Sequence, residues 1–372
     1  MKIVSNKVSA MNRRDFSKLS ALALAATQIP ASAQAPSEKP VGFAPVGLGN
    51  ISNTFMEAIA NSKTAKVTGL VTGHPKEKGG KYSAMYGVPK SSIYTYETYD
   101  RILDNKDIDA VYIGLPNSMH AEYTIRAAQA GKHVLCEKPM AISSAECRQM
   151  IDACKAHNVK LMIAYRLQYD PFWKKVKDMV AAGDIGDVIN IHGGYWGFQP
   201  LGAWRIDRKL SGGGSLMDLG IYPLNITRYI LGEEPSSFGA NVATRDKQSG
   251  RFNTVEESVE WTMKFPSGVL ASCGTTYAGR GGPSLLRING NKGYLQMDAC
   301  FTYDGAHLTG TTSKGKIDEI DPGKRPFQFT NEAEHFADCI RTNQQPHTPG
   351  EEGLKDLHAI EAIYKAAGAP IG

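Results

Sequence analysis

Short apolar stretches alternate with helix-forming stretches between residues 41 and 164, and this alternation constrains the fold more than any other feature of the chain. The expected strands are residues 41–48, 66–71, 110–115, 133–136 and 160–164. The expected helices are residues 51–61, 98–104, 122–130 and 143–157, the last one capped by Ser143 or Ser144. Apolar strands that alternate with helices predict a parallel sheet covered on both faces.

The pattern changes after residue 165, where short strands are separated by turn residues. The expected strands are residues 188–196, 258–265, 269–275, 284–288 and 294–297. This spacing predicts a largely antiparallel sheet, and residues 327–342 and 350–367 are expected to form helices that pack back on the structure. A chain of 372 residues exceeds what one hydrophobic core usually supports. We therefore predict an α/β protein with a doubly wound parallel sheet at residues 41–165 and a second α/β domain at residues 166–372.

The first 33 residues have the parts of a secretory signal peptide. Arg13 and Arg14 precede an apolar stretch at residues 19–29, and Ala31-Ser32-Ala33 provides small residues for cleavage. The arginine pair resembles a twin-arginine signal, which exports folded proteins to the periplasm. The alternative is a membrane-anchoring or internal amphipathic helix, but the apolar stretch is too short to span a bilayer and Pro30 ends it.

The net charge of the chain excludes some classes of partner. The formal charge is +5, but five basic residues and one acidic residue lie within residues 1–33, which leaves the mature chain nearly neutral. A nearly neutral chain offers no electrostatic basis for binding nucleic acid or an anionic membrane. We expect neither partner after cleavage, a linker arm at residues 34–40, and initiation at either Met1 or Met11.

Cysteine usage favours free thiols. An even number of cysteines permits disulfides in an exported protein, and this chain has six: Cys136, Cys147, Cys154, Cys273, Cys300 and Cys339. A chain of this size does not need disulfides for stability, and a protein that folds before export folds in a reducing compartment. The sequence has no C-x-x-C pair or metal-ligand spacing, so we expect no metal.

A glycine-rich loop follows the first expected strand. The run from Gly47 to Ser52 reads G-x-G-x-x-S and leads into a helix. The first glycine permits a tight turn, and Gly49 lets backbone amides approach a pyrophosphate at the helix N-terminus. This arrangement predicts a dinucleotide-binding domain of the Rossmann type. Pro45 is unusual in such a strand because it removes a backbone donor from the ladder.

The end of the second expected strand favours NADP over NAD. NAD sites carry a carboxylate there to hold the ribose hydroxyls. This chain instead has Thr72-Gly73-His74, followed by Lys76, Lys78 and Lys81. A hydroxyl and lysines suit a 2′-phosphate, although a solvated, basic helix start would have the same composition. We predict NADP with Thr72 and Lys78 at the phosphate, and Lys76 and Lys81 remain alternatives.

Two further segments carry groups that could transfer a proton. Lys138 follows a strand in the run Cys136-Glu137-Lys138-Pro139, and ligands of open α/β sheets bind at such strand ends. Asp218 and Tyr222 lie four residues apart after Gly212-Gly213-Gly214, so they share one face of a helix expected to start near residue 215. A lysine ammonium near a phenol favours the phenolate, which would allow Tyr222 to act as an acid and base. Alternatively, Tyr222 could be a buried aromatic residue.

These residues together resemble the Gfo/Idh/MocA family of dehydrogenases along essentially the whole mature chain. The resemblance is carried by residues 110–118, 130–134, 136–140, 162–171, 204–205, 212–231 and 349–353. It is greatest to the glucose–fructose and aldose–aldose oxidoreductases. The resemblance implies a Rossmann domain followed by an α/β domain with an open-faced sheet that supports homo-oligomers, either dimers or tetramers.

The resemblance also assigns site residues. Lys138, Asp218 and Tyr222 match the catalytic lysine, aspartate and tyrosine of the family. The residues that would contact the cofactor are Gly47, Gly49, Asn50 and Ile51 at the pyrophosphate, Leu115, Asn117, His120, Glu137 and Lys138 at the nicotinamide ribose, and Arg166, Trp204 and Arg205 at the nicotinamide. The arm before the first domain is shorter than in glucose–fructose oxidoreductases, where it reaches a neighbouring subunit's cofactor.

The predicted export constrains the activity. Free NADP is not expected in the periplasm, so an exported dehydrogenase must carry its cofactor and regenerate it in place. We therefore expect a sugar oxidoreductase with tightly bound NADP that oxidises an aldose to its lactone and reduces a second sugar to an alditol. The alternatives are a simple NADP-dependent aldose dehydrogenase, a glycosidase of the same family that uses transient oxidation, and a non-enzymatic sensor.

Overall fold

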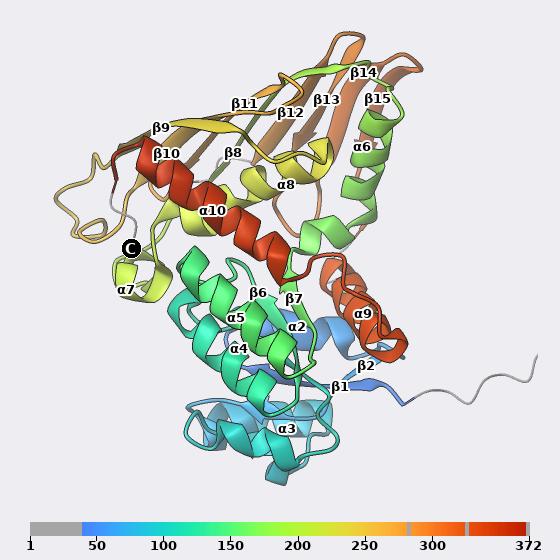
Figure 1. Cartoon of the computed structure of the whole chain (residues 1–372), viewed down its shortest axis with the longest axis vertical. Coiled ribbons are helices and arrows are strands. Elements are labelled where there is room, and N and C mark those ends of the chain that lie inside the picture. The colour runs from blue at the N-terminus through green and yellow to red at the C-terminus, as the bar shows by residue number, and fades with distance from the viewer. Residues whose placement is uncertain (1–38, 281–283, 324–326, 370–372) are drawn as a thin grey trace, which may run out of the picture. The chain divides into compact units, whose positions relative to one another are not determined.

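The computed structural model describes residues 39–280, 284–323 and 327–369 (Figure 1). The predicted signal peptide and nearly all of the predicted arm lie outside the described residues. Within the described part, two sheets with their helices account for the whole architecture. This arrangement confirms the predicted α/β fold class.

The first sheet is parallel and seven-stranded within the described residues, with the order β4-β3-β1-β5-β6-β7 and with β2 also paired to β1. Its strands are β1 (Val41–Val46), β2 (Ala65–Val67), β3 (Leu70–Val71), β4 (Ile93–Tyr94), β5 (Ala110–Ile113), β6 (His133–Glu137) and β7 (Leu161–Ala164). Its helices are α2 (Asn50–Ile59), α3 (Gly80–Tyr86), α4 (His120–Gln129) and α5 (Ser144–Ala156). Ser143 caps α5 by accepting a hydrogen bond from the Glu146 amide at 3.2 Å, which resolves the two predicted caps.

Pro45 explains why the second expected strand is divided. That strand was expected at residues 66–71, but it consists of β2 and β3 with a break at Thr68-Gly69. The register advances from Phe43↔Val67 to Val46↔Val71, so the partner strand has one extra residue beside Pro45. The break lies where Pro45 cannot donate a ladder hydrogen bond, which is how a proline is accommodated in this central strand.

The second sheet has eight strands within the described residues, in the order β15-β14-β13-β12-β8-β11-β10-β9. Its strands are β8 (Val188–Trp196), β9 (Ser237–Ala243), β10 (Ser258–Lys264), β11 (Leu270–Thr276), β12 (Leu285–Gly290), β13 (Gly293–Asp298), β14 (His307–Thr312) and β15 (Gly315–Ile320). Neighbouring strands are antiparallel except β8 and β11, which confirms the predicted sheet. Sequence analysis missed β9, β14 and β15.

Helices α6 (Pro171–Ala181), α8 (Ile221–Leu231) and α10 (Gly350–Ala366) lie on one face of the second sheet (Figure 1). The short helix α7 (Arg208–Ser211) precedes the glycine run. No described helix covers the opposite face of this sheet in Figure 1. Residues 98–104 were expected as a helix but form a 3₁₀ helix over Tyr99–Asp104.

The two C-terminal helices contact elements of both sheets. Helix α9 (Phe327–Thr342) packs on α2 and on the 3₁₀ turn Arg166–Tyr169, and α10 packs on α5, β7, α8 and β9. Between α2, the parallel sheet and α9, the rings of Phe43, Phe55, Tyr112 and Phe336 are fully buried. The end of the structure that holds the parallel sheet therefore has an apolar core that α9 completes.

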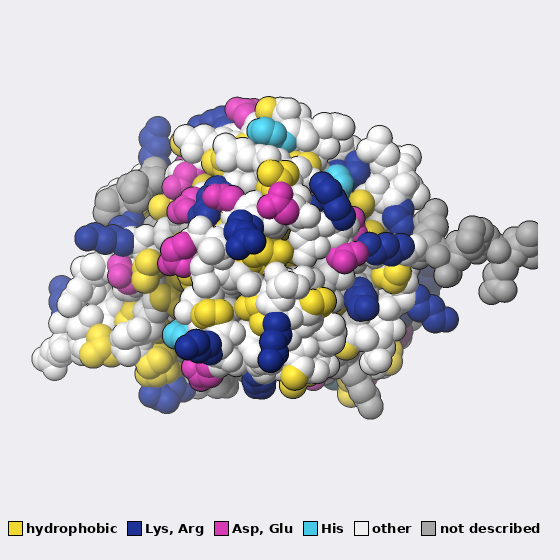
Figure 2. Space-filling view, turned by 90° about the horizontal axis from the view of Figure 1, so that it is seen from below, with side chains coloured by type: hydrophobic (Ala, Val, Ile, Leu, Met, Phe, Trp, Pro, Cys, Tyr) yellow, Lys and Arg dark blue, Asp and Glu magenta, His cyan; other side chains and the backbone are white. Residues whose placement is uncertain are grey.

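The cysteines and the surface charges of the described residues can be compared with the sequence analysis. All six cysteines are buried free thiols, as predicted. Seen from below, basic and acidic side chains are interspersed with uncharged ones (Figure 2). Among the described helices, none combines the length and hydropathy that a membrane crossing requires.

Candidate active site

Lys138, Asp218 and Tyr222 are brought together from distant parts of the chain. Lys138 follows β6, whereas Asp218 and Tyr222 lie in the segment that begins α8. The Lys138 ammonium donates to the Asp218 backbone carbonyl at 2.8 Å and to Asp218 Oδ1 at 3.2 Å. It also lies 4.4 Å from the centre of the Tyr222 ring. The parallel sheet and the second sheet therefore contribute to one cluster.

The turn that carries Asp218 differs from the expected helix. Residues Leu216–Gly220 form a π-helical turn, and α8 begins only at Ile221. Buried Glu256 holds this turn by accepting hydrogen bonds from the amides of Gly214 (2.9 Å) and Leu216 (3.1 Å). A Cβ on Gly214 would lie 2.2 Å from the Glu256 carbonyl oxygen, so only glycine allows this approach.

The Asp218 carboxylate accepts from three donors. Oδ1 accepts from Lys138, and Oδ2 accepts from Arg205 Nε at 3.0 Å and from the Tyr277 hydroxyl at 2.9 Å. Burial opposes ionisation of Asp218, but Lys138, Arg205 and Tyr277 together hold its pKa below the usual value. Asp218 therefore holds the Lys138 and Arg205 side chains in place. Because Oδ1 accepts one hydrogen bond and Oδ2 accepts two, Oδ1 can accept more additional hydrogen bonds than Oδ2.

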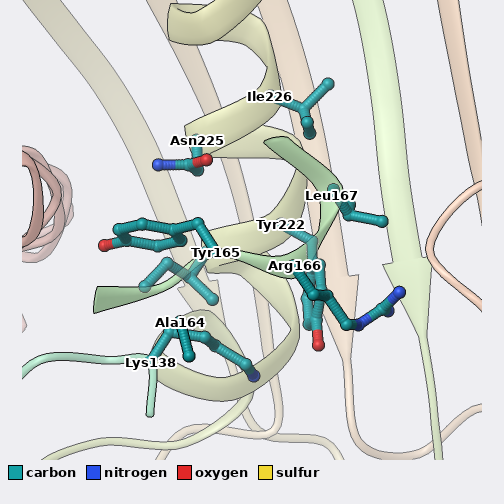
Figure 3. Close-up of a pocket in the computed structure, with 9 residues that line it drawn as sticks. Lys138, Ala164, Tyr165, Arg166, Leu167, Tyr222, Asn225 and Ile226 are labelled. Atoms are coloured by element: carbon teal, nitrogen blue, oxygen red, sulfur yellow. The ribbon is translucent and has the colours of Figure 1, made fainter. Parts of the chain in front are cut away.

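The ring of Tyr222 lies between two cations. Figure 3 shows its side chain between Lys138 and Arg166, and the Arg166 guanidinium carbon is 5.2 Å from the ring centre. Burial alone would lower the pKa of Lys138, but Tyr222, Asp218 and Glu137 raise it, so the ammonium stays charged. Phe301 stacks on the Tyr222 ring with centroids 5.8 Å apart. The Tyr222 ring is therefore in contact with two cations and one aromatic ring.

A small cavity adjoins this cluster. It has a volume of about 10 Å³ and is lined by Lys138, Arg166, Tyr222, Tyr165 and Asn225, among others (Figure 3). That volume accommodates roughly one water molecule and is too small for a sugar. Tyr222, Lys138 and Asp218 are each partly exposed to solvent.

Arg166 is a buried cation whose bonded partners are all neutral. Its guanidinium donates to the carbonyls of Thr302 (3.1 Å) and Phe301 (2.7 Å) and to the Gln328 side chain. Its Nε is buried without a hydrogen-bond partner among the described residues. Arg166 therefore keeps a full positive charge next to Tyr222.

The other two residues predicted at the nicotinamide end form a pair at the rim of the cluster. The Arg205 guanidinium stacks over the Trp204 ring at 4.5 Å while Arg205 Nε binds Asp218. About 38% of the Arg205 side chain is exposed, whereas 17% of the Asp218 side chain is. Arg205 is thus the most accessible charged group in contact with Asp218.

The glycine-rich loop has the geometry that a pyrophosphate needs. Gly47 has φ +82°, and a Cβ on it would lie 2.6 Å from Leu115 Cδ2, so this turn requires glycine. A Cβ on Gly49 would meet nothing within 4 Å, and the N-terminus of α2 from Asn50 has no side-chain cap. With Asn50 and Ile51 in the first turn, unsatisfied amides and open space lie together, which fits a dinucleotide phosphate.

One of the three candidate lysines contacts this loop. The Lys78 ammonium donates to the Leu48 carbonyl at 3.3 Å. Lys81 instead lies over the ring of Tyr82. Thr72 is buried, and its hydroxyl oxygen accepts from the His74 amide at 3.1 Å. Among these residues, the position of Lys78 is the one most consistent with a phosphate-binding role at this end of the loop.

Two of the residues predicted at the nicotinamide ribose, Asn117 and His120, contact backbone carbonyls. Asn117 is buried and donates to the Ser211 carbonyl at 2.8 Å, which joins the two halves of the chain. Both ring nitrogens of His120 lie 2.9 Å from backbone carbonyls, those of Leu115 and Pro139. Burial lowers the pKa of His120, and the buried ring has no nitrogen left for a ribose in this arrangement. Its predicted contact with the cofactor stays a prediction.

Sequence analysis identified Glu137 but missed Glu332, a second buried acid that interacts with it. The Tyr112 hydroxyl donates to Glu137 at 2.5 Å, and burial raises the pKa of Glu137 although Tyr112 and Lys138 oppose this shift. Glu332, on α9, is fully buried, and both its oxygens lack a hydrogen-bond partner among the described residues. Burial and the nearby Glu137 raise the pKa of Glu332 well above its usual value.

Comparisons with known proteins identify the family to which the chain belongs. Residues 41–165 match the model of an oxidoreductase family with an NAD-binding Rossmann fold, and residues 173–296 match the GFO/IDH/MocA C-terminal domain. The chain is 31% identical to a D-xylose 1-dehydrogenase [NADP(+)] from Haloarcula marismortui, over 90% of this chain and 93% of that protein. It is 28% identical to a 1,5-anhydro-D-fructose reductase from Ensifer adhaerens, over 87% and 95% of the two chains.

A solved structure is similar over the same extent. The crystal structure of aldose-aldose oxidoreductase from Caulobacter crescentus, complexed with glycerol, superposes with a TM-score of 0.84. The two chains are 38% identical, and the match covers 88% of this chain and 98% of that one.

Proposed function

Because the chain belongs to the GFO/IDH/MocA oxidoreductase family, we propose that it is a sugar oxidoreductase with tightly bound NADP. It would oxidise an aldose to its lactone and reduce a second sugar to an alditol at the same site. The observation that carries this proposal is the Tyr222 phenol between the Lys138 and Arg166 cations at the carboxyl end of the parallel sheet. When bound, NADP supplies a hydride acceptor and, once reduced, a hydride donor.

Residues of this chain would accept and return the proton. In its phenolate form, Tyr222 takes the proton of the anomeric hydroxyl while the hydrogen at the same carbon leaves as hydride. In the second half-reaction Tyr222 returns that proton to the carbonyl oxygen of the open-chain sugar as its carbon receives the hydride. Lys138 stabilises the phenolate, and Asp218 keeps the Lys138 ammonium in place. Protons and electrons balance over the two half-reactions.

Two observations support NADP as the nucleotide. The segment after β3 offers Thr72, Gly73 and His74 but no carboxylate, and Lys78 lies against the pyrophosphate loop. The xylose dehydrogenase relative is named for NADP(+). A 2′-phosphate would gain a charge-assisted contact with Lys78 that a 2′-hydroxyl could not make.

Sugars are supported as substrates by the names of the relatives, which act on xylose, anhydrofructose and aldoses. The twin-arginine pattern at Arg13-Arg14 supports export to the periplasm with the cofactor already bound. Exchange of hydride between two sugars would then regenerate the cofactor without any soluble nucleotide. The uncovered face of the second sheet supports a homo-oligomer, because such a face usually needs a partner layer.

A simple NADP-dependent aldose dehydrogenase is the second candidate, favoured by the xylose dehydrogenase relative. The test is to incubate purified mature protein with single aldoses and with aldose–ketose pairs, without added nucleotide. The proposal predicts lactone and alditol in equal amounts from pairs. Turnover that requires added NADP would instead favour the simple dehydrogenase, and free sugar released from an aryl glycoside would favour a glycosidase.

A further inference from the structure

Tyr277 is a fully buried residue with a polar contact that connects it to the cluster. It follows β11, and its hydroxyl donates to Asp218 Oδ2 at 2.9 Å. Burial raises the pKa of Tyr277 well above its usual value, with Asp218 adding to the shift, so the hydroxyl keeps its proton and donates. Sequence analysis did not identify this residue.

The Tyr277 side chain is more deeply buried than that of Arg205, which donates to the same Asp218 oxygen. Its ring packs in a small apolar cluster with Ile206, Phe252 and Val255, and its amide donates to the Glu257 carbonyl at 2.9 Å. Arg205, in contrast, has a long side chain that is more than one third exposed. A tyrosine has two rotatable side-chain torsions and therefore defines the position of its hydroxyl closely.

The contacts form a chain that leads to Tyr222. Tyr277 holds Oδ2 of Asp218, Oδ1 of the same carboxylate holds the Lys138 ammonium, and that ammonium lies over the Tyr222 ring. Rotation of the Asp218 carboxylate would move the acceptor on which Lys138 depends. The apolar cluster around Tyr277 includes Ile206 from the turn that carries Arg205, so the same packing fixes a second donor.

We infer that Tyr277 is a positioning residue for proton transfer, because its hydroxyl fixes the Asp218 carboxylate that holds Lys138 over Tyr222. It does not touch the substrate, since its side chain is fully buried. This inference rests on the proposed function, in which Tyr222 moves the proton. Its hydroxyl acts through Asp218.

The charged and titratable groups around Asp218 determine the expected pH response. They are Lys138 after β6, Arg205 in the turn Trp204–Ile206, Tyr277 after β11, Tyr195 on β8 and, behind Tyr277, the buried Glu256. Three of these donate to the carboxylate and favour its ionised form. Removal of the Tyr277 donor leaves the others in place and shifts the protonation of Asp218 to higher pH.

The test uses Tyr277→Phe in the complete protein with its nucleotide. Tyr99→Phe is the matched control, because Tyr99 is also fully buried and donates one hydrogen bond, to the Tyr123 carbonyl at 3.0 Å, away from the cluster. Single-turnover reduction of the bound nicotinamide by an aldose is followed by absorbance over a pH series. We expect the rate to fall roughly tenfold in Tyr277→Phe, the value lost with one hydrogen bond to a charged group, with KM nearly unchanged.

The pH series separates positioning from packing. The acid limb of the profile should move to higher pH in Tyr277→Phe and stay in place in Tyr99→Phe. If Tyr277→Phe lowers the melting temperature but leaves both the rate per folded molecule and the acid limb unchanged, the residue serves packing alone and the inference is overturned.

A thermal unfolding cycle provides a readout that does not depend on activity. Tyr277→Phe, Asp218→Asn and the double variant are melted at pH 7. Coupling between the two sites supports the link between Tyr277 and the carboxylate; additive effects refute it. Coupling in a protein that oxidises no sugar would leave the link intact and would contradict the proposed function.

Discussion

The ammonium of Lys138 lies 4.4 Å from the centre of the Tyr222 ring, while Arg166 lies 5.2 Å from the same centre on another side. A phenol between two cations is suited to give up and regain a proton. This relationship leads to the most direct prediction, which concerns the hydroxyl of Tyr222.

Tyr222→Phe should lower both half-reactions by about 100- to 10,000-fold, the usual contribution of a general acid–base group. The ring and its contacts with Phe301 and the two cations remain, so the melting temperature should change little. Single-turnover oxidation and reduction of the bound nicotinamide measure the effect. Tyr229→Phe, on the same helix α8, is the control. Rates within about threefold of the parent would exclude Tyr222 as the proton carrier.

The purified mature protein should contain NADP without any being added. Denaturation followed by mass spectrometry of the released nucleotide identifies it. Recovery of NAD alone, or of no nucleotide from protein isolated from the periplasm, would contradict the proposal.

Lys78→Ala should reduce the NADP retained after gel filtration in high salt, because its ammonium lies against the pyrophosphate loop. Loss of one charge-assisted contact predicts about tenfold weaker retention of NADP and little change for NAD. Lys76→Ala and Lys81→Ala are the matched controls. A larger loss with either control would move the phosphate site to that lysine.

Glu332→Gln should change how stability depends on pH. Burial raises the pKa of Glu332 well above its usual value, so between the unfolded and folded pKa the folded protein binds more protons. The free energy of unfolding therefore falls as pH rises above about 4.3, by up to about 1.4 kcal/mol per pH unit from this group. Glu332→Gln removes that slope. The melting temperatures of the parent and of Glu332→Gln, measured from pH 5 to pH 8, should converge at low pH. Glu334→Gln, on the same helix, is the control. Parallel curves for the parent and Glu332→Gln would mean that Glu332 is ionised throughout.

Replacement of Arg13-Arg14 by Lys-Lys should keep the protein in the cytoplasm, because twin-arginine recognition depends on the arginines rather than on their charge alone. Cell fractionation of both forms measures the periplasmic share. Equal periplasmic yields would indicate another export route.

Local patterns predicted most of the framework. Apolar runs, glycine turns and helical spacing located all of the longer parallel strands, five strands of the second sheet and both C-terminal helices. The sequence analysis missed helix α6, although the sequence carries a helix-start signal there: Asp170 caps the helix and Pro171 is its first residue. The missed strand β9 also has a local signal, since Phe238, Ala240 and Val242 recur at every second position and are its half-buried residues.

Some residues of the candidate site could be predicted from local sequence, and others only from the tertiary structure. Gly47, Gly49, Lys138 and the Asp218–Tyr222 pair could be found from the chain itself, since each depends on neighbours within a few positions: a tight turn, a strand end or a helical face. What only the tertiary structure decided is which distant groups meet them. Tyr277 reaches Asp218, and Glu332 lies beneath Glu137, only because β11 and α9 pack where they do. The charge of a buried group depends on its desolvation and on the donors that surround it, and neither quantity exists until the sheets and helices have assembled.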